Sequence, residues 1–143
     1  MPLWKIYHPK SAYTAEEKQA IAAKITGLYA AAMPKFYVGV IFQEIAPDSF
    51  YIGGEPHGQF VRIWIDHIAR EFKSENAVNR FIKGVNDVLA PWVRDRGFDW
   101  EFHIDETPFA MWSIQGYSPP AQGTADELRW IAENRPSPRT DAE

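Results

Sequence analysis

The chain has 143 residues, a length typical of one domain, and its 45% hydrophobic and 15% aromatic residues are enough to build a core. With a formal net charge of −4 and no basic stripe, the composition argues against nucleic acid as a partner. No apolar run approaches the roughly 20 residues of a membrane span, no secretory signal is present, and the absence of cysteine excludes disulfides and thiolate chemistry. We therefore expect a cytoplasmic protein without a membrane partner.

Strands and capped helices alternate along the chain. In order, we expect a strand at 2–8, a helix from 14 to about 33, a strand at 37–45, a glycine turn at 53–54, a strand at 60–68, a helix that starts at Ser74, and a strand at 98–105. Thr14 and Glu17 have the spacing of a capping box, and Ser74 is a favourable N-cap. The strand at 37–45 is dense in apolar residues, which predicts burial on both faces.

The order strand, capped helix, strand occurs twice, which predicts an α+β fold. Two β-α-β units, at about 2–45 and 60–105, would form a four-stranded sheet with two helices on one face. The length of each crossover favours parallel pairing within a unit. We expect this domain to span 1–118, followed by a C-terminal helix and tail over 119–143.

The carboxyl-terminal segment predicts one more short helix. Thr124 and Glu127 repeat the capping-box spacing, and the residues from 135 onward have the composition of a disordered tail. The four side chains of Trp100, Phe109, Met111 and Trp112 carry more apolar surface than two helices can absorb. We therefore expect oligomerisation through the uncovered face of the sheet.

The second residue is a proline at the start of a strand. Proline tolerates this position because its missing N–H costs no hydrogen bond there. If Met1 is removed, however, Pro2 becomes a free secondary amine with a reference pKa of roughly 8. Apolar neighbours such as Trp112 and nearby cations would lower that pKa, and an amine with a pKa near neutrality is an effective general base.

Two cations precede the cap of the second helix. Arg70 and Lys73 stand just before Ser74, where backbone N–H groups and the helix dipole attract anions. Together they could form a carboxylate clamp, in which arginine binds with two parallel bonds and lysine as a point charge. The alternative is a solvated loop whose charges are balanced by Glu71 and Glu75.

The histidines show no metal-binding spacing, and we expect neither a metal nor a cofactor. His57 falls in a turn. His103 lies on the last strand of the sheet, where it is either a hydrogen-bond donor in a pocket or a half-exposed strand residue. Asp66, next to His67, is more typical of a loop-stabilising residue than of a catalytic one.

The Met-Pro start, the two β-α-β units and the cations after the third strand together resemble the tautomerase superfamily. The double-length chain is similar to its cis-3-chloroacrylic acid dehalogenase-like group, through the segments "VGVIFQEI", "FYIGGEPHGQ" and "DETPFAMW". The resemblance covers about residues 1–117. It implies a tautomerase-like fold, an amino-terminal proline as catalytic base or acid, and a homotrimer.

The resemblance also assigns individual residues. Pro2 matches the catalytic proline, Arg70 matches the first of two carboxylate-binding arginines, and Lys73 stands in place of the second. Tyr29 stands where the dehalogenase has a histidine, and His103, or its neighbour Phe102, where that enzyme has a tyrosine. The water-activating glutamate of the dehalogenase falls near Ile114 or Gln115, where no carboxylate is present.

Keto–enol tautomerisation requires one base and a group that stabilises the carboxylate and the developing enolate. Pro2, Arg70 and His103 are the expected catalytic residues, and Lys73, Tyr29 and Trp112 the expected substrate-binding residues. The expected substrate is a small carboxylate: a 2-oxo acid, a 2-hydroxy-dienoate or an arylpyruvate.

Two alternatives stay open at this stage. One is a hydratase, dehalogenase or decarboxylase of small three-carbon unsaturated acids. The other is a non-catalytic carboxylate- or partner-binding protein, for which a retained Met1 would be the signature, because the nitrogen of a peptide-linked Pro2 has no basic lone pair.

Overall fold

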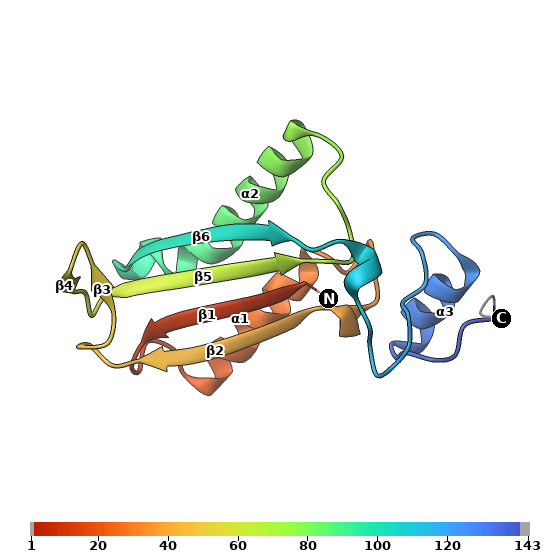
Figure 1. The fold of residues 1–143 in the computed structure, drawn as a ribbon. Coiled ribbons are helices and arrows are strands. Elements are labelled where there is room, and N and C mark those ends of the chain that lie inside the picture. Colours follow the sequence, from red (N-terminus) through yellow and green to blue (C-terminus); the bar gives the residue numbers. More distant parts are fainter. Residues whose placement is uncertain (1, 141–143) are drawn as a thin grey trace.

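The computed structural model describes residues 2–140. In chain order the elements are β1 Leu3–Pro9, α1 Ala15–Gly27, η1 Lys35–Tyr37, β2 Gly39–Ile45, β3 Tyr51–Ile52, β4 Glu55–Pro56, β5 Phe60–His67, α2 Glu75–Leu89, η2 Ala90–Trp92, η3 Arg94–Arg96, β6 Asp99–Glu106, η4 Phe109–Met111 and α3 Ala125–Glu133 (Figure 1). The predicted α+β class, with two β-α-β units, is confirmed.

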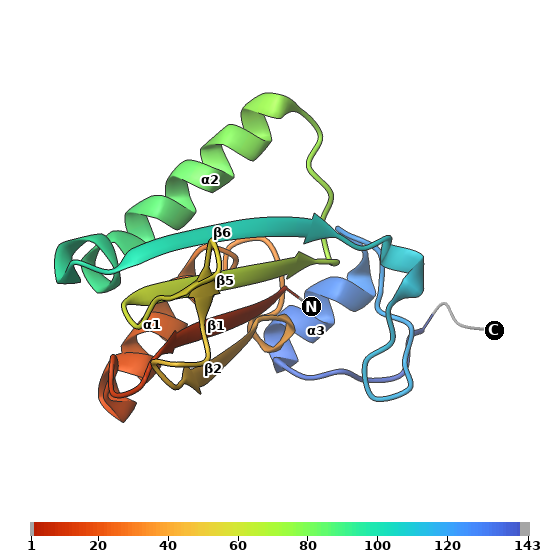
Figure 2. The same cartoon turned by 60° about the vertical axis from the view of Figure 1, so that its left-hand side comes forward.

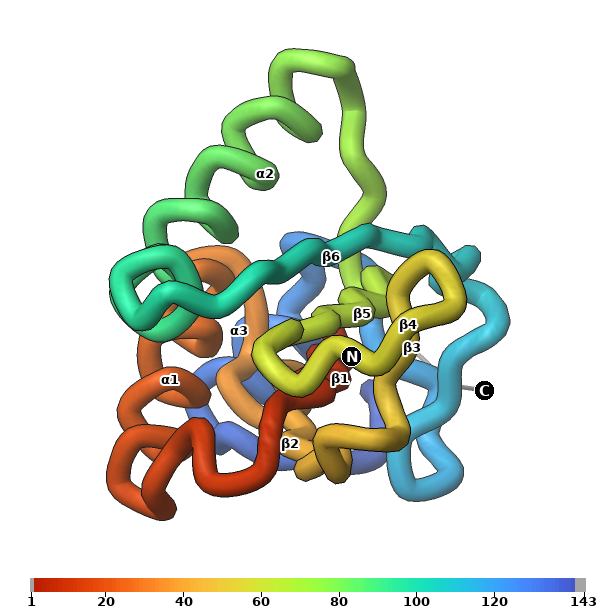
Figure 3. Tube along the Cα trace, turned by 90° about the vertical axis from the view of Figure 1, so that its left-hand side faces the viewer, coloured from red at the N-terminus to blue at the C-terminus, as the bar shows by residue number. Residues whose placement is uncertain are grey.

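The four long strands form one mixed sheet in the order β2-β1-β5-β6. β1 pairs with β2, and β5 with β6, in parallel, whereas the central pair β1 and β5 is antiparallel. The parallel pairing expected within each unit is therefore confirmed. In Figure 3, which looks along the strands, α1 and α2 lie on the same side of the sheet.

The alternation of β1 and β5 decides which side chains face the helices. Trp4, Ile6 and His8 of β1 are buried, as are the four alternate residues Val61, Ile63, Ile65 and His67 of β5. Side chains of period two on neighbouring strands meet on one face, so these residues form the floor on which the helices pack. The opposite face of the sheet is open in the single chain.

The helix caps form largely as expected. Thr14 and Glu17 make both bonds of a capping box at the start of α1, and the Ser74 side chain accepts a bond from the Ala77 amide at the start of α2. At α3 only half of the predicted box forms. The Thr124 hydroxyl accepts from the Glu127 amide, but the Glu127 carboxylate turns to other partners.

Two predicted boundaries were wrong. α1 ends at Gly27 rather than near Met33, because the next amides form tighter bonds, such as Leu28 N–H to the Ile25 carbonyl at 3.0 Å. The segment after Gly27 turns inward and buries Tyr29 and Met33. The strand predicted at 37–45 starts at Gly39, since Tyr37 belongs to the short η1 helix.

Two expectations about burial were also wrong. β2 is an edge strand and is not covered on both faces, and its Ile41 is 48% exposed. Trp100 and Trp112 are partly buried against the core, whereas Met111 is 76% exposed. Exposed large apolar side chains on the open face include Ile41 and Trp64, the latter 38% exposed.

The segment after α3 is not a disordered tail as far as residue 140. The indole N–H of Trp130, which is fully buried, donates to the Ser137 carbonyl at 3.1 Å, and the Thr140 amide donates to Asp126 at 2.8 Å. These bonds fold the segment back against α3. In Figures 1 and 2, α3 lies beyond the end of the sheet at which β1 begins and β5 and β6 end.

Within residues 2–140, no helix is both long and apolar enough to cross a membrane.

Candidate active site

The start of β1 lies beside a large cavity. Pro2 is buried, and its carbonyl accepts a bond of 2.8 Å from the Gly39 amide of β2. The next residue, Leu3, lines a cavity of about 640 Å³, which we call the strand-end cavity. Pro2 therefore directly precedes a residue that lines a space large enough for a small ligand.

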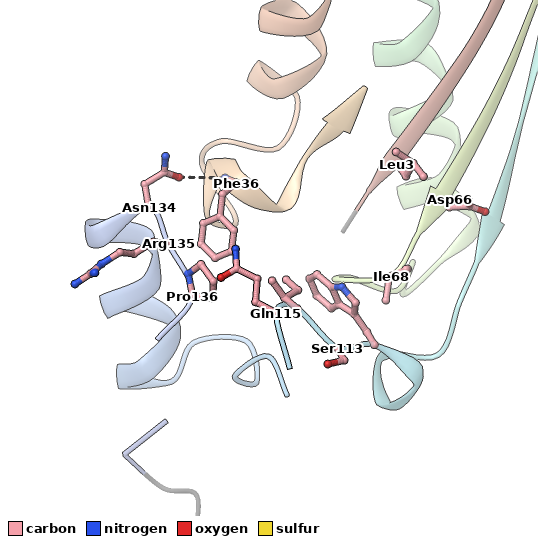
Figure 4. A pocket seen from close by; sticks show the side chains of 11 residues that line it. Leu3, Phe36, Asp66, Ile68, Ser113, Gln115, Asn134, Arg135 and Pro136 are labelled. Atoms are coloured by element: carbon pink, nitrogen blue, oxygen red, sulfur yellow. Dashed lines mark hydrogen bonds between the residues drawn. The ribbon is translucent and has the colours of Figure 1, made fainter. Parts of the chain in front are cut away.

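Residues from five parts of the chain line the strand-end cavity. They come from β1 and β5, from η1, from the segment after η4, and from the end of α3: Leu3, Phe36, Asp66, Ile68, Trp112, Ser113, Ile114, Gln115, Asn134, Arg135 and Pro136 (Figure 4). Most of this lining is apolar. The Asn134 side chain accepts a bond of 3.1 Å from the Phe36 amide, which ties the C-terminal segment to the wall formed by η1.

Arg70 and Lys73 line a second, smaller cavity. This space, of about 160 Å³, also includes Phe109 and Gln122, and we call it the clamp cavity. It shares Ile68 with the strand-end cavity. The two cations predicted as a clamp therefore converge, next to the cavity at the start of β1.

Arg70 already has a partner. Its Nη2 lies 2.7 Å from Glu127 Oε1, and only 3% of the Glu127 side chain is exposed. The guanidinium also donates to the carbonyls of Ala32 and Ala69. Glu127 was predicted only as a capping residue, and nothing in its spacing indicates a buried ion pair with a residue 57 positions away.

Tyr29 belongs to a buried hydrogen-bond chain rather than to the wall of either cavity. The indole N–H of Trp4 donates to the Tyr29 hydroxyl at 2.9 Å, and that hydroxyl lies 2.8 Å from Nε2 of His67. Trp4 can only donate, so the Tyr29 oxygen accepts from it, and the hydroxyl hydrogen of Tyr29 has a partner only if it points at His67. Nε2 of His67 is therefore the acceptor, and burial lowers the pKa of His67 to about 4, so the ring is neutral at pH 7.

His67 was not predicted as a site residue. The pairing of Leu3 with Asp66, continued by one residue, places His67 opposite Pro2 on the buried face of the sheet. A third small cavity is lined by Tyr29, His67 and Arg70. The signal in the sequence was the alternation of Ile63 and Ile65 with His67, which places that histidine on the buried face at the end of a strand.

His103 lies away from both cavities in the single chain. It occupies the open face of the sheet beside Trp64, where its Nδ1 accepts from the Arg62 guanidinium and its Nε2 is 3.3 Å from Asp105. The structure thus brings Trp112 to the strand-end cavity beside Pro2, places Arg70 and Lys73 in the adjoining one, and leaves His103 on another surface. No group of three or more histidines and carboxylates in residues 2–140 is arranged to hold a metal ion.

Comparison with known proteins identifies the family. A family of proteins assigned as oxalocrotonate tautomerase enzymes matches residues 1–135. The chain belongs to this family. No protein of curated function matches it.

Two solved structures are similar to the chain over nearly its whole length. RhCC from Rhodococcus jostii RHA1 is 38% identical, with a TM-score of 0.94, over 96% of this chain and 100% of that protein. A protein from the thermophilic fungus Aspergillus fumigatus is 39% identical, with a TM-score of 0.92, over 97% and 98% of the two chains. The C-terminal helix α3 therefore lies within the region that these two structures share with this chain.

More distant structures share the fold. N1, a member of the cis-3-chloroacrylic acid dehalogenase family, is 19% identical with a TM-score of 0.70, over 92% of this chain and 91% of its own. A native fused 4-OT protein is 16% identical with a TM-score of 0.65, over 82% and 95% of the two chains. The predicted resemblance to double-length members of the tautomerase superfamily is confirmed.

Proposed function

We propose that the protein is a tautomerase in which Pro2, as the amino-terminal residue, is the general base for keto–enol conversion of a small carboxylic acid. One observation carries the proposal: Pro2 is buried at the start of β1, and Leu3 next to it lines the strand-end cavity. An apolar surrounding disfavours the protonated form of an amine, which supports a free Pro2 nitrogen as the base. Family membership supports the same reaction class.

The reaction moves one proton and needs no co-reactant. The Pro2 nitrogen removes the proton from the enol hydroxyl, and electrons from that O–H bond form the carbonyl as the enol double bond shifts. The protonated nitrogen then gives a proton to the neighbouring carbon. A cation near the carboxylate stabilises the enolate that forms between the two steps, and Lys73 in the adjoining cavity has the charge for this role.

The test compares phenylenolpyruvate ketonisation by the wild-type protein and by Pro2→Ala. We expect kcat/KM to fall by at least about a hundredfold, because general-base catalysis typically contributes that much. Equal rates for the two proteins would overturn the proposal. Intact-mass measurement must accompany the kinetics, because the reaction requires that Met1 be removed and the Pro2 nitrogen be free of its peptide bond.

A hydratase is the second candidate, because a carboxylate does line the strand-end cavity. Asp66 faces the same space as Ile114 and Gln115, and its Oδ2 is 3.5 Å from Lys5 Nζ. A carboxylate there could activate water for addition to an unsaturated three-carbon acid. Product analysis with propynoate or a 3-haloacrylate, comparing the wild-type protein and Asp66→Asn, separates this reaction from tautomerisation.

The proposal includes assembly into a homotrimer through the open face of the sheet. Ile41 and Trp64 lie exposed on that face, and a fused 4-OT protein of the same fold is described as an asymmetric trimer. Assembly through this face would also bring His103 against a neighbouring subunit, so its predicted catalytic role belongs to the assembled protein.

A further inference from the structure

The ion pair between Arg70 and Glu127 bears on which acids the site accepts. The geometry points to Glu127 as a specificity-determining residue: it takes up the charge of Arg70, so that the site selects monocarboxylates over dicarboxylates, with Lys73 as the cation that binds the single carboxylate. This inference rests on the proposed function and narrows its substrate to acids of the arylpyruvate class.

The hydrogen bonds of Arg70 leave it no pair of neighbouring N–H groups for a two-bond contact with a substrate carboxylate, although its buried Nε has no partner among residues 2–140. Two parallel bonds from a guanidinium use either Nε with Nη2 or Nη1 with Nη2, so each arrangement needs a free Nη2 hydrogen. Nη2 of Arg70 has two hydrogens. One goes to Glu127 Oε1 at 2.7 Å and the other to the Ala32 carbonyl, so neither arrangement is open.

Glu127 is held as firmly as Arg70. While Oε1 binds the guanidinium, Oε2 accepts from the Gly123 amide at 2.7 Å, and the Glu127 amide donates to the Thr124 hydroxyl at 3.3 Å. The side chain is 3% exposed. Breaking a buried ion pair leaves an uncompensated charge, so a substrate carboxylate that displaced Glu127 would have to overcome that cost.

The remaining charges of the clamp cavity favour a single carboxylate. Its lining includes Arg70, Lys73 and Glu71. With Glu127 paired to Arg70, the four side chains carry no net charge before a substrate enters. No ion pair joins Lys73 to a carboxylate within the described part of the chain. One substrate carboxylate can pair with Lys73, whereas a second would be placed near Glu71 and Glu127.

The shape of the neighbouring space fits the rest of such a substrate. Phe36, Ile68, Trp112 and Ile114 supply apolar walls in the strand-end cavity, and Ile68 is common to both cavities. An aryl group gains free energy by leaving water for such walls, whereas a second carboxylate loses it. An enol with one carboxylate and one aromatic ring can place the carboxylate in the clamp cavity and the ring in the strand-end cavity.

The experiment compares two enol substrates, phenylenolpyruvate with one carboxylate and 2-hydroxymuconate with two, in Glu127→Gln and in the wild-type protein. Removing the charge of Glu127 should raise the ratio of kcat/KM for the dicarboxylate over the monocarboxylate by about tenfold, the effect of one nearby charge at intermediate dielectric. Lys73→Gln should lower kcat/KM for phenylenolpyruvate by about tenfold, because it removes the cation that binds the carboxylate and stabilises the enolate. Asp87→Asn is the matched control, because it removes an exposed carboxylate paired with Lys83 at 2.6 Å on α2.

Three outcomes would overturn the inference. The first is an unchanged ratio of kcat/KM for the dicarboxylate over the monocarboxylate in Glu127→Gln. The second is an equal drop of KM for both substrates in Glu127→Gln, with no effect of Lys73→Gln, because it would mean that substrates displace Glu127 and bind Arg70. If Glu127→Gln does not fold, Glu71→Gln tests the same charge balance, and an unchanged ratio there is the third.

A failure of the proposed function can be told apart from a failure of this inference. Calorimetric binding of cinnamate and of cis,cis-muconate, which do not tautomerise, should show the same preference for the monocarboxylate in Pro2→Ala as in the wild-type protein. Loss of catalysis with this preference intact would remove the role of Pro2 alone. Equal binding of both acids would overturn the role of Glu127.

Discussion

At the scale of single residues, His67 is the clearest case of a tertiary environment changing a side chain's chemistry. It is 6% exposed, stacks on Phe72 and accepts from Tyr29, and burial lowers its pKa from 6.5 to about 4. A neutral histidine that cannot take up a proton at pH 6 is a fixed hydrogen-bonding group. It holds the floor of the site opposite Pro2 without adding charge to it.

The lowered pKa of His67 predicts a loss of stability in acid. Between pH 6.5 and about 4 the unfolded chain binds a proton at this histidine that the folded chain does not, so stability falls as the pH falls through that window and falls no further below it. The difference between the two pKa values of His67, 6.5 and about 4, corresponds to about 3 kcal/mol in the free energy of unfolding. Urea denaturation at a series of pH values, with His67→Gln as the comparison, measures it.

The difference in the pH dependence of stability between the wild-type protein and His67→Gln reports the contribution of this histidine, because all other titrating groups are common to both. Glutamine keeps an acceptor for the Tyr29 hydroxyl but does not titrate. The wild-type protein should lose more stability than His67→Gln between pH 6.5 and 4. Parallel curves would mean that His67 becomes protonated in the folded state.

At the scale of elements, the start of α1 is fixed by local sequence and then joined to the rest of the fold. Thr14 and Glu17 complete the capping box, with bonds of 3.0 and 3.2 Å. The Glu17 carboxylate also pairs with the Arg96 guanidinium of η3 at 2.5 Å, and that guanidinium lies over the ring of Tyr13. The cap thus connects the first crossover to the segment that precedes β6.

Thr14→Ala should lower the free energy of unfolding by about 1 kcal/mol, because it leaves the Glu17 amide without its acceptor. Thr14→Ser should restore most of that loss, since serine presents the same oxygen. Chemical denaturation of the three proteins measures both effects. Equal stability of the alanine and wild-type proteins would show that solvent replaces the cap at no cost.

At the scale of the whole molecule, the two helices cover one face of the sheet, and the other face is open in the single chain (Figure 3). Ile41 of β2 is 48% exposed and Trp64 of β5 is 38% exposed on this face. Apolar side chains gathered on one face are typical of interaction surfaces. The single chain therefore has a buried core on one side of the sheet and exposed apolar side chains on the other.

If the protein forms the proposed trimer, Ile41→Lys should shift it toward monomers, because the substitution places a charge in the proposed apolar contact between subunits. Sedimentation velocity at several protein concentrations measures the shift. Leu128→Lys is the control, since Leu128 is 60% exposed on α3, away from the sheet. A trimer that survives Ile41→Lys but dissociates in Leu128→Lys would assign the interface to α3 instead.

Local patterns were sufficient for much of the fold and for part of the site. The two β-α-β units follow from period-two strands and from the caps at Thr14 and Ser74, because these signals depend on neighbouring residues only. The spacing of Arg70 and Lys73 left a carboxylate clamp and a solvated loop open as alternatives, and both residues line one cavity in the structure. The early end of α1 was missed because it depends on the burial of Tyr29 against His67, a contact between distant segments.

The sequence by itself determined the α+β class, the pairing within each unit, and the residue types that could carry the chemistry, including Pro2, Arg70 and Lys73. Only the tertiary structure decided the state of those residues. It paired Arg70 with Glu127 from the end of the chain, placed His67 opposite Pro2, and set His103 on the open face of the sheet. The physical reason is that charge, burial and hydrogen bonding at a site depend on which distant segments meet there, and periodicity along the chain does not encode that meeting.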